Sequence, residues 1–250
     1  MKNEIILWIS SIIIVFLIGY VKNVTDSDYP VTGTFGIEGK KVSYKLDKVC
    51  LDKTSYKNII LSDFDGIKGK LIWKTDSRQQ EKEYQKIEKG LECDIPRLKP
   101  GQKIEYKVVL IYSERSFEIP KEGFITLTFW GNIPSGAKVL TFIFLYGGLL
   151  LSIRCLLELF NKNKNLKKYA VLNCSFLLIL NSIIIPLRNS YKLGAINNYV
   201  PNVIDLIDPA FLIILFLWIA GTIFFFYKKH IHPVLILITL VTVILFFFFK

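Results

Sequence analysis

The stretch VLTFIFLYGGLLLSIRCLLELF, residues 139–160, carries only two charged side chains, Arg154 and Glu158, both near its end. Four further apolar stretches occupy residues 5–21, 169–187, 209–227 and 233–249. Each is close to the length of about 17 to 25 residues that crosses the hydrocarbon core of a bilayer. The sequence therefore predicts an integral membrane protein with five transmembrane α-helices, the first separated from the other four by a long polar stretch.

The distribution of charge predicts the orientation. The formal net charge is +11, yet residues 22–122 hold 20 Lys and Arg against 17 Asp and Glu. This near balance argues against a nucleic-acid surface. Six lysines lie in the short loops 161–168 and 228–229, and short lysine-rich loops stay on the cytoplasmic side. We expect a multi-pass protein of the cytoplasmic (inner) membrane, with its N-terminus inside and its central domain and C-terminus outside.

Three regions follow from this pattern. Residues 1–22 lack a small-x-small cleavage site after the apolar stretch, so they are expected to be a retained signal anchor. Residues 23–136 form the extracytoplasmic domain, and residues 137–250 form a four-helix transmembrane domain. The predicted fold class is an α+β membrane protein.

The central domain is predicted to be a β-sandwich. Short runs rich in β-branched and aromatic residues alternate with turn residues, which is typical of a two-sheet, immunoglobulin-like or fibronectin type III-like fold. Trp73 is expected at the centre of its core, and residues 95–106 are expected to form a hairpin closed by Pro100-Gly101. Tyr106 has either the corner role of such domains or an ordinary half-buried strand position. The predicted strands are 41–46, 58–61, 70–74, 84–88, 91–95, 103–111 and 123–130.

The chain shows no catalytic motif, and no metal or cofactor site is expected. Its four cysteines lack metal-ligand spacing, and the central domain contains no His. Cys50 and Cys93 are candidate disulfide partners because they lie in the domain expected outside the cytoplasm. Cys155 and Cys174 lie in apolar stretches, where they are expected to be small packing residues.

Polar residues inside membrane helices are costly and mark candidate functional positions. Arg154 and Glu158 are four residues apart, so they share a helix face and can pair, either as a structural ion pair or as a functional site. Asn173 and Asn181 are expected to make interhelical hydrogen bonds. Pro186 is expected at the end of its helix rather than within it.

The loop between the third and fourth apolar stretches carries two aspartates. Asp205 and Asp208 are three residues apart, so they are expected to share one face of a helical turn. Pro209 suits the first turn of the next helix, and Asp208 is then expected to be its N-cap. A functional role for the two aspartates is the alternative.

Several segments together resemble an uncharacterised family of bacterial integral membrane proteins. These segments are residues 29–35 (YPVTGTF), 42–45 (VSYK) and 95–106, Leu151-Ser152-Ile153-Arg154 with Glu158, and Gly194-Ala195 followed by Pro201, Asp205 and Asp208. The resemblance implies an N-terminal anchor, an extracytoplasmic β-domain and four further membrane helices. Relatives often have His before the first aspartate, whereas this chain has Ile204, which removes a ligand for any metal or haem in that loop.

Two classes of function remain open. The first is a non-enzymatic membrane subunit or scaffold. Its helices contact the lipid membrane, and its β-sandwich binds a protein partner in the membrane or envelope. The second is a small transporter or membrane-embedded enzyme subunit that uses Arg154, Glu158, Asp205 and Asp208. The lack of catalytic motifs and of internal repeats favours the first class.

Overall fold

A computed structural model describes residues 2–26, 28–37, 39–51, 55–62, 66–75, 78–113, 115–161, 165–195, 201–227 and 231–248. The chain divides into two compact units. The helical unit comprises Met1–Asp26, Ile133–Tyr191 and Ala195–Lys250, and the β unit comprises Ser27–Asn132 with Lys192–Gly194. The protein is thus α+β, with its helices and strands segregated. The expected anchor boundary at residue 22 falls inside the first helix, which continues to Thr25.

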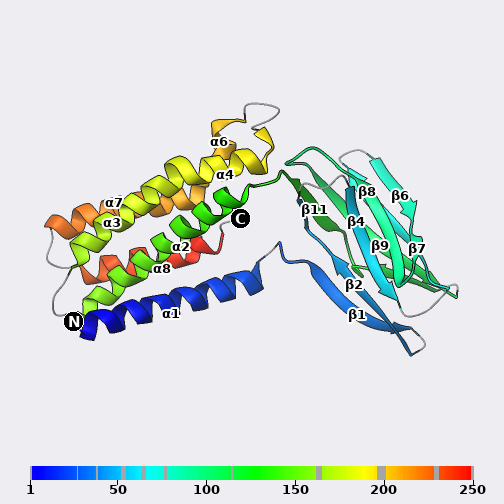
Figure 1. The fold of residues 1–250 in the computed structure, drawn as a ribbon, viewed down its shortest axis with the longest axis horizontal. Helices are drawn as coiled ribbons and strands as arrows, with labels where there is room; N and C mark the ends of the chain where they lie inside the picture. The colour runs from blue at the N-terminus through cyan, green and yellow to red at the C-terminus, as the bar shows by residue number, and fades with distance from the viewer. Residues whose placement is uncertain are drawn as a thin grey trace. The chain divides into compact units, whose positions relative to one another are not determined.

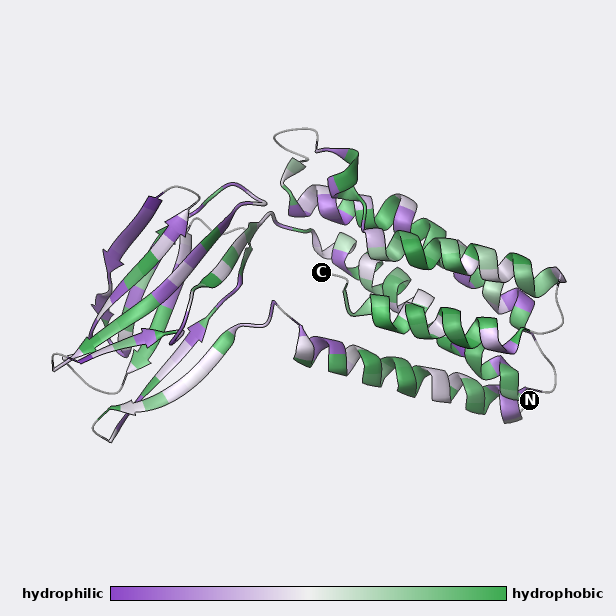
Figure 2. Cartoon of the chain, turned by 180° about the vertical axis from the view of Figure 1, so that it is seen from behind, coloured by the Kyte–Doolittle hydropathy of each residue, from purple (hydrophilic) through white to green (hydrophobic). Residues whose placement is uncertain are grey.

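The helical unit contains several long apolar helices (Figure 1). Four segments of the described chain are long and apolar enough to cross a membrane: Asn3–Thr25, Ser135–Phe160, Leu166–Lys192 and Pro209–Tyr227. Figure 2 shows their hydrophobic residues along most of their length. The helices are α1 (Lys2–Thr25), α2 (Ser135–Leu157) with a 3-10 turn at Glu158–Phe160, α3 (Leu166–Ile179), a π-helical turn at Leu180–Ile184, α4 (Ile185–Lys192), α6 (Val203–Leu206), α7 (Pro209–Tyr227) and the shorter α8 (His232–Phe246).

Helix α2 lies at the centre of the helical unit, in contact with α1, α3 and α8. Glycines allow the close approach: a Cβ atom added at Gly147 would lie 2.8 Å from the Phe176 ring, and one at Gly19 would lie 2.9 Å from the Tyr146 ring. Small residues at such positions let helix backbones pack tightly in lipid. The Gly147-Gly148 pair thus fixes how closely α3 can approach α2.

The β unit has two sheets that share one hydrophobic core. One sheet has the order β1-β2-β4-β8-β7, and the other has the order β3-β11-β9-β5-β6, with β10 paired to β9. Trp73 and Tyr106 both belong to this core, with exposed fractions of 6% and 0%. The strands are β1 (Val31–Ile37), β2 (Lys40–Leu46), β3 (Val49–Leu51), β4 (Ser55–Ser62), β5 (Lys68–Thr75), β6 (Arg78–Glu83), β7 (Gln85–Ile87), β8 (Gly90–Pro96), β9 (Lys103–Tyr112), β10 (Arg115–Ile119) and β11 (Ile125–Trp130).

The expected hairpin over residues 95–106 is wrong. Strand β8 pairs with β4 and β7, whereas β9 pairs with β5, β10 and β11, so the connection crosses from one sheet to the other. The turn itself is present, because the Gln102 N–H donates to the Lys99 carbonyl at 3.1 Å and Gly101 has φ +87°. These are the features of a type II turn with Pro100 before the glycine.

The candidate disulfide between Cys50 and Cys93 is not formed in the structure. Both side chains are buried in the core. The Cys93 thiol instead lies 3.9 Å from the Lys82 carbonyl, to which it can donate a weak hydrogen bond. Burial raises the pKa of Cys93 to about 11, so the thiol is neutral and poorly reactive at neutral pH.

Candidate functional site

A buried charged cluster lies at one end of the helical unit, where α1 begins, α2 ends and α3 begins (Figure 1). Arg154 and Glu158 form an ion pair of 2.5 Å between Nη1 and Oε1, and both side chains are fully buried. Snorkelling toward water, expected for long charged side chains near a helix end, is therefore not how this chain accommodates them. The charges are neutralised inside the protein instead.

Two aromatic rings flank the Arg154 guanidinium. Its central carbon lies 5.3 Å from the centroid of the Trp8 ring on α1 and 4.8 Å from that of the Tyr169 ring on α3. The two rings meet edge to face at 5.7 Å. The guanidinium Nε and Nη2 have no hydrogen-bond acceptor among the described residues. Contact with the ring faces, worth about 0.5–2 kcal/mol each, stabilises the cation in their place.

The Glu158 carboxylate is fully hydrogen-bonded. It accepts from the Asn161 amide at 3.2 and 3.1 Å and from the Asn165 backbone N–H at 3.1 Å. The Asn165 side chain in turn donates to Glu4 of α1 at 3.3 Å. One arginine and one carboxylate thus tie together the ends of three helices.

A second polar feature lies along α3. The Asn173 amide donates to Ser152 on α2 at 2.9 Å, which is an interhelical bond. Asn181 departs from the expectation, because its amide donates to the Leu177 carbonyl of its own helix at 2.8 Å and its Oδ1 is buried without a partner in the described residues. Asn181 lies in the π-helical turn that precedes Pro186.

Pro186 is not at a helix end, contrary to the expectation. The helix continues to Lys192 through α4, which begins one residue before the proline. Proline removes one backbone donor from a helix. A wider π turn directly before it re-routes the hydrogen bonds so that the helix continues.

The two loop aspartates are not brought together. Helix α6 ends at Leu206, and Ile207 is extended with φ −97° and ψ 143°, so the expected shared helical face is absent. Pro209 disfavours helical backbone at Asp208, the residue before it, so a helix that continues through both aspartates is disfavoured. Asp208 accepts hydrogen bonds from the N–H groups of Ala210 at 3.0 Å and Phe211 at 3.4 Å. It caps α7, while Asp205 is exposed.

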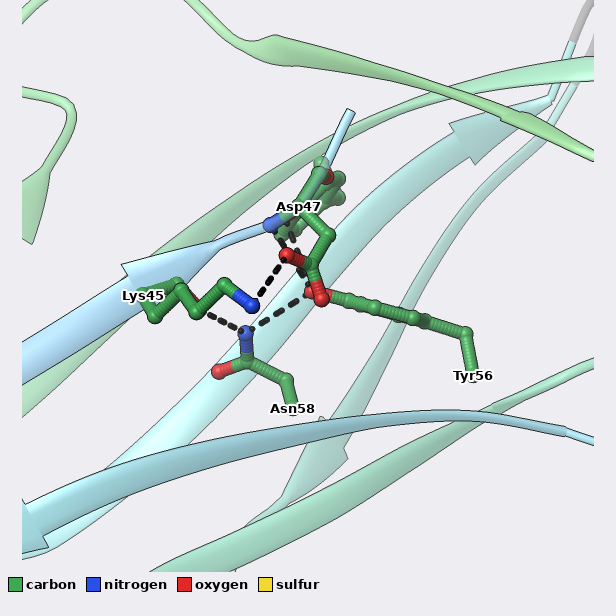
Figure 3. A network of polar contacts seen from close by, with 5 residues as sticks. Lys45, Asp47, Tyr56 and Asn58 are labelled. Atoms are coloured by element: carbon green, nitrogen blue, oxygen red, sulfur yellow. Dashed lines mark hydrogen bonds and ion pairs between the residues drawn. The ribbon is translucent and has the colours of Figure 1, made fainter. Parts of the chain in front are cut away.

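The β unit contains a buried polar network of its own (Figure 3). The Tyr106 hydroxyl donates to the Asp47 carbonyl at 2.8 Å and lies 3.2 Å from the Tyr56 hydroxyl. The Asn58 amide donates to Tyr56 at 3.2 Å and to the Lys45 carbonyl at 3.3 Å, and its oxygen accepts from Tyr84 at 2.6 Å. Tyr106 thus bonds to a carbonyl 59 residues upstream rather than to a nearby one, so it does not have the corner role.

Burial raises the pKa of the three tyrosines Tyr56, Tyr84 and Tyr106 above the ordinary value of 10.0. They are therefore neutral hydrogen-bonding groups at physiological pH. The network joins β2 and β4 of one sheet to β9 of the other sheet through neutral donors and acceptors. Tyr84, which lies between β6 and β7, also belongs to it. It locks the two sheets together and offers no general base.

The sequence identified Arg154 with Glu158 but missed the residues around them. Asn161 follows Glu158 by three residues, a local spacing that could have pointed to it, whereas Asn165 stands before the start of α3. Trp8, Tyr169 and Glu4 are brought in by tertiary packing, for which a single sequence carries no signal.

No group of three or more His, Cys, Asp or Glu side chains is placed to hold a metal ion within the described residues. Comparison of the chain with protein-family models, with curated proteins and with solved structures finds no match. The geometry of the chain itself is therefore the basis for a functional proposal.

Proposed function

We propose that this protein is a non-enzymatic, multi-pass subunit or scaffold of a bacterial cytoplasmic (inner) membrane. In this proposal its β unit is an immunoglobulin-like sandwich outside the cytoplasm that binds a protein partner. Helix α8, with 15 residues in its regular part, is the fifth membrane span, and its C-terminal end lies outside.

The burial and mutual neutralisation of Arg154 and Glu158 carry this proposal. A transported ion or substrate needs charged groups that it can reach, whereas these two groups are fully buried and paired with each other. Asp208 is likewise engaged in capping α7. Three of the four candidate residues, Arg154, Glu158 and Asp208, thus support the helical unit. The outer strands of the two sheets in the described part of the β unit are then available for recognition.

The orientation is supported by the placement of the basic residues. Lys167 and Lys168 are exposed at the start of α3. The N-terminal part of α1 lies at the same end, because Asn165, just before α3, bonds to Glu4 of α1. Lysines at this end favour its retention in the cytoplasm. The other end of α1, from which the chain enters the β unit, then faces outward.

Co-purification of the tagged full-length chain in mild detergent tests this function. We expect one partner at constant stoichiometry from native membranes, retained in the variant Asp205→Asn and in the variant Arg154→Lys, which keeps the positive charge of the pair. A cell that carries Arg154→Lys should then behave as the unmodified cell does. If it shows the defect of a deletion strain although the variant is folded and still binds its partner, the scaffold role is contradicted and transport or catalysis is favoured.

The alternative, a small transporter or membrane-embedded enzyme subunit, is favoured by one observation. The π-helical turn at Leu180–Ile184 buries the Oδ1 of Asn181, which has no hydrogen-bond partner among the described residues, inside the helical unit. Such turns often occur at functional sites. Replacement of Asn181 by Leu separates the two functions. A scaffold should retain its partner in this variant, whereas a transporter should lose its activity.

A further inference from the structure

Two outer strands of the β unit, β1 and the three-residue β3 (VCL), carry no charged residue, and β1 is the longer of the two. Strand β1, VTGTFGI, contains no charged residue and pairs only with β2 among the described strands. Strand β6, RQQEKE, is the edge of the other sheet and is exposed along its whole length. Charged edge strands resist pairing with other chains, whereas an uncharged edge is open to it. Figure 2 shows this contrast between pale β1 and hydrophilic β6.

A cleft of about 650 Å³ lies between β1 and β10. Strand β10 pairs only with β9 among the described strands, so the cleft is bordered by one free strand edge from each sheet. Its lining includes the half-buried rings of Phe35 and Phe117, whose centroids are 5.8 Å apart. At its rim, Glu118 is paired with Lys107 at 2.9 Å. The cleft therefore combines an apolar wall at the two rings with a polar rim that also includes Ser116 and Lys121.

The direction of the β1 backbone groups follows from the register. The Lys45 carbonyl accepts from Asn58 on β4, so it points away from β1. Lys45 pairs with Thr32, and Ser43 pairs with Thr34. Residues in an antiparallel ladder alternate between bonding to the partner strand and pointing away from it. The N–H and C=O groups of Thr32 and Thr34 therefore point to the open edge, beside the cleft.

We propose that this cleft binds an extended segment of a partner protein, which adds as a strand to the β1 edge and packs a large apolar side chain against the contacting rings of Phe35 and Phe117. The backbone groups of Thr32 and Thr34 supply the hydrogen bonds of strand addition, and the rings supply side-chain selectivity. This inference rests on the proposed function, because it specifies where and how the β unit binds its partner.

Proline at residue 34 gives a sharp test. Because the Thr34 N–H points away from β2, Thr34→Pro removes the donor that an added strand needs and leaves the β1–β2 ladder intact. Thr34→Val keeps the N–H and is the matched control. A photo-crosslinking residue, benzoylphenylalanine, is placed at exposed Ser116 on β10, across the cleft. The full-length chains are irradiated in native membranes, and the crosslinked peptides are mapped by mass spectrometry.

We expect the otherwise unmodified chain and Thr34→Val to crosslink one segment of a partner protein, with a yield at least about ten-fold lower in Thr34→Pro. Thr32→Pro is the second variant should Thr34→Pro unfold, as judged by its thermal transition. Equal yields in the folded proline variants would overturn the inference, as would crosslinks to a second copy of this chain. A partner that co-purifies without crosslinking at Ser116 would overturn the strand addition alone, whereas the absence of any partner would overturn the proposed function.

Discussion

The two units bury polar side chains in different ways. The helical unit buries an ion pair, and the buried side-chain polar atoms that lack a hydrogen bond in the described residues all belong to it, on Arg154, Asn173, Asn181 and Thr239. The β unit buries a neutral network in which Asn58 and three tyrosines bond to one another and to the backbone. Removing the partner of a buried charge costs more stability than removing one member of a neutral hydrogen-bond network. The comparison therefore predicts a rank order of mutational effects.

The largest effect is expected for Arg154→Met. The substitution leaves the Glu158 carboxylate buried without its cation, and breaking a buried pair costs about 3–5 kcal/mol. Unfolding of the full-length protein in detergent by increasing amounts of a denaturing detergent measures this loss. The double variant Arg154→Met/Glu158→Gln removes both charges and should recover more than half of it. A double variant as unstable as the single one would show that packing, not charge, is lost.

Alkaline pH should destabilise the β unit. Since burial raises the folded-state pKa of Tyr56, Tyr84 and Tyr106, only the unfolded chain ionises once the pH exceeds about 10. Their contribution is complete below that pH and falls above it, by about 1.4 kcal/mol per pH unit for Tyr84 and for Tyr106, whose pKa values burial raises most. The unfolding free energy between pH 8 and 11 measures the slope, which Tyr84→Phe should reduce. An unchanged slope in that variant would mean that Tyr84 is not buried.

A smaller loss is expected for Asn58→Ala. The change leaves the Tyr84 hydroxyl and the Lys45 carbonyl without their partner, at a cost of about 1–3 kcal/mol. Thr126→Ala, at an exposed position of β11, is the control and should change stability by less than about 0.5 kcal/mol. Thermal unfolding of the full-length variants decides this, and equal midpoints for the two variants would refute the role given to the network.

The smallest effect separates the two loop aspartates. Asp208→Ala removes the N-cap of α7 and should cost about 1 kcal/mol. Asp205→Ala alters an exposed side chain and should cost less than about 0.5 kcal/mol. Both values come from the same denaturation experiment. A larger loss for Asp205 would show that this carboxylate has a contact beyond the described residues.

Periodicity and composition predicted the apolar helices, because a membrane-spanning run is a local property of the sequence. The structure has a strand at each of the seven places where the sequence predicted one. Four further strands, β1, β3, β6 and β10, were not predicted. Strand β1 contains strand-favouring Val, Thr, Phe and Ile, but Gly33 and Gly36 interrupt the run, so its sequence alone did not predict a strand. The sheet to which each strand belongs depends on contacts distant in sequence, which is why the hairpin over residues 95–106 was wrong.

The candidate site was predictable in part for the same reason. The Arg154 and Glu158 pair is local, as a four-residue spacing on one helix, and so is the Asp208 cap before Pro209. The rings of Trp8 and Tyr169 reach Arg154 from two other helices. Such tertiary contacts leave no mark in one sequence.

The orientation of the β unit is tested most directly by cysteine labelling. Cysteine is introduced at exposed Gln80 on β6 in one variant and at exposed Lys168 on α3 in another, and cells stripped of any outer barrier are treated with a membrane-impermeant maleimide. The account predicts that Gln80→Cys is labelled in intact cells and that Lys168→Cys is labelled only after the membrane is permeabilised. Labelling of Lys168→Cys alone in intact cells would contradict it.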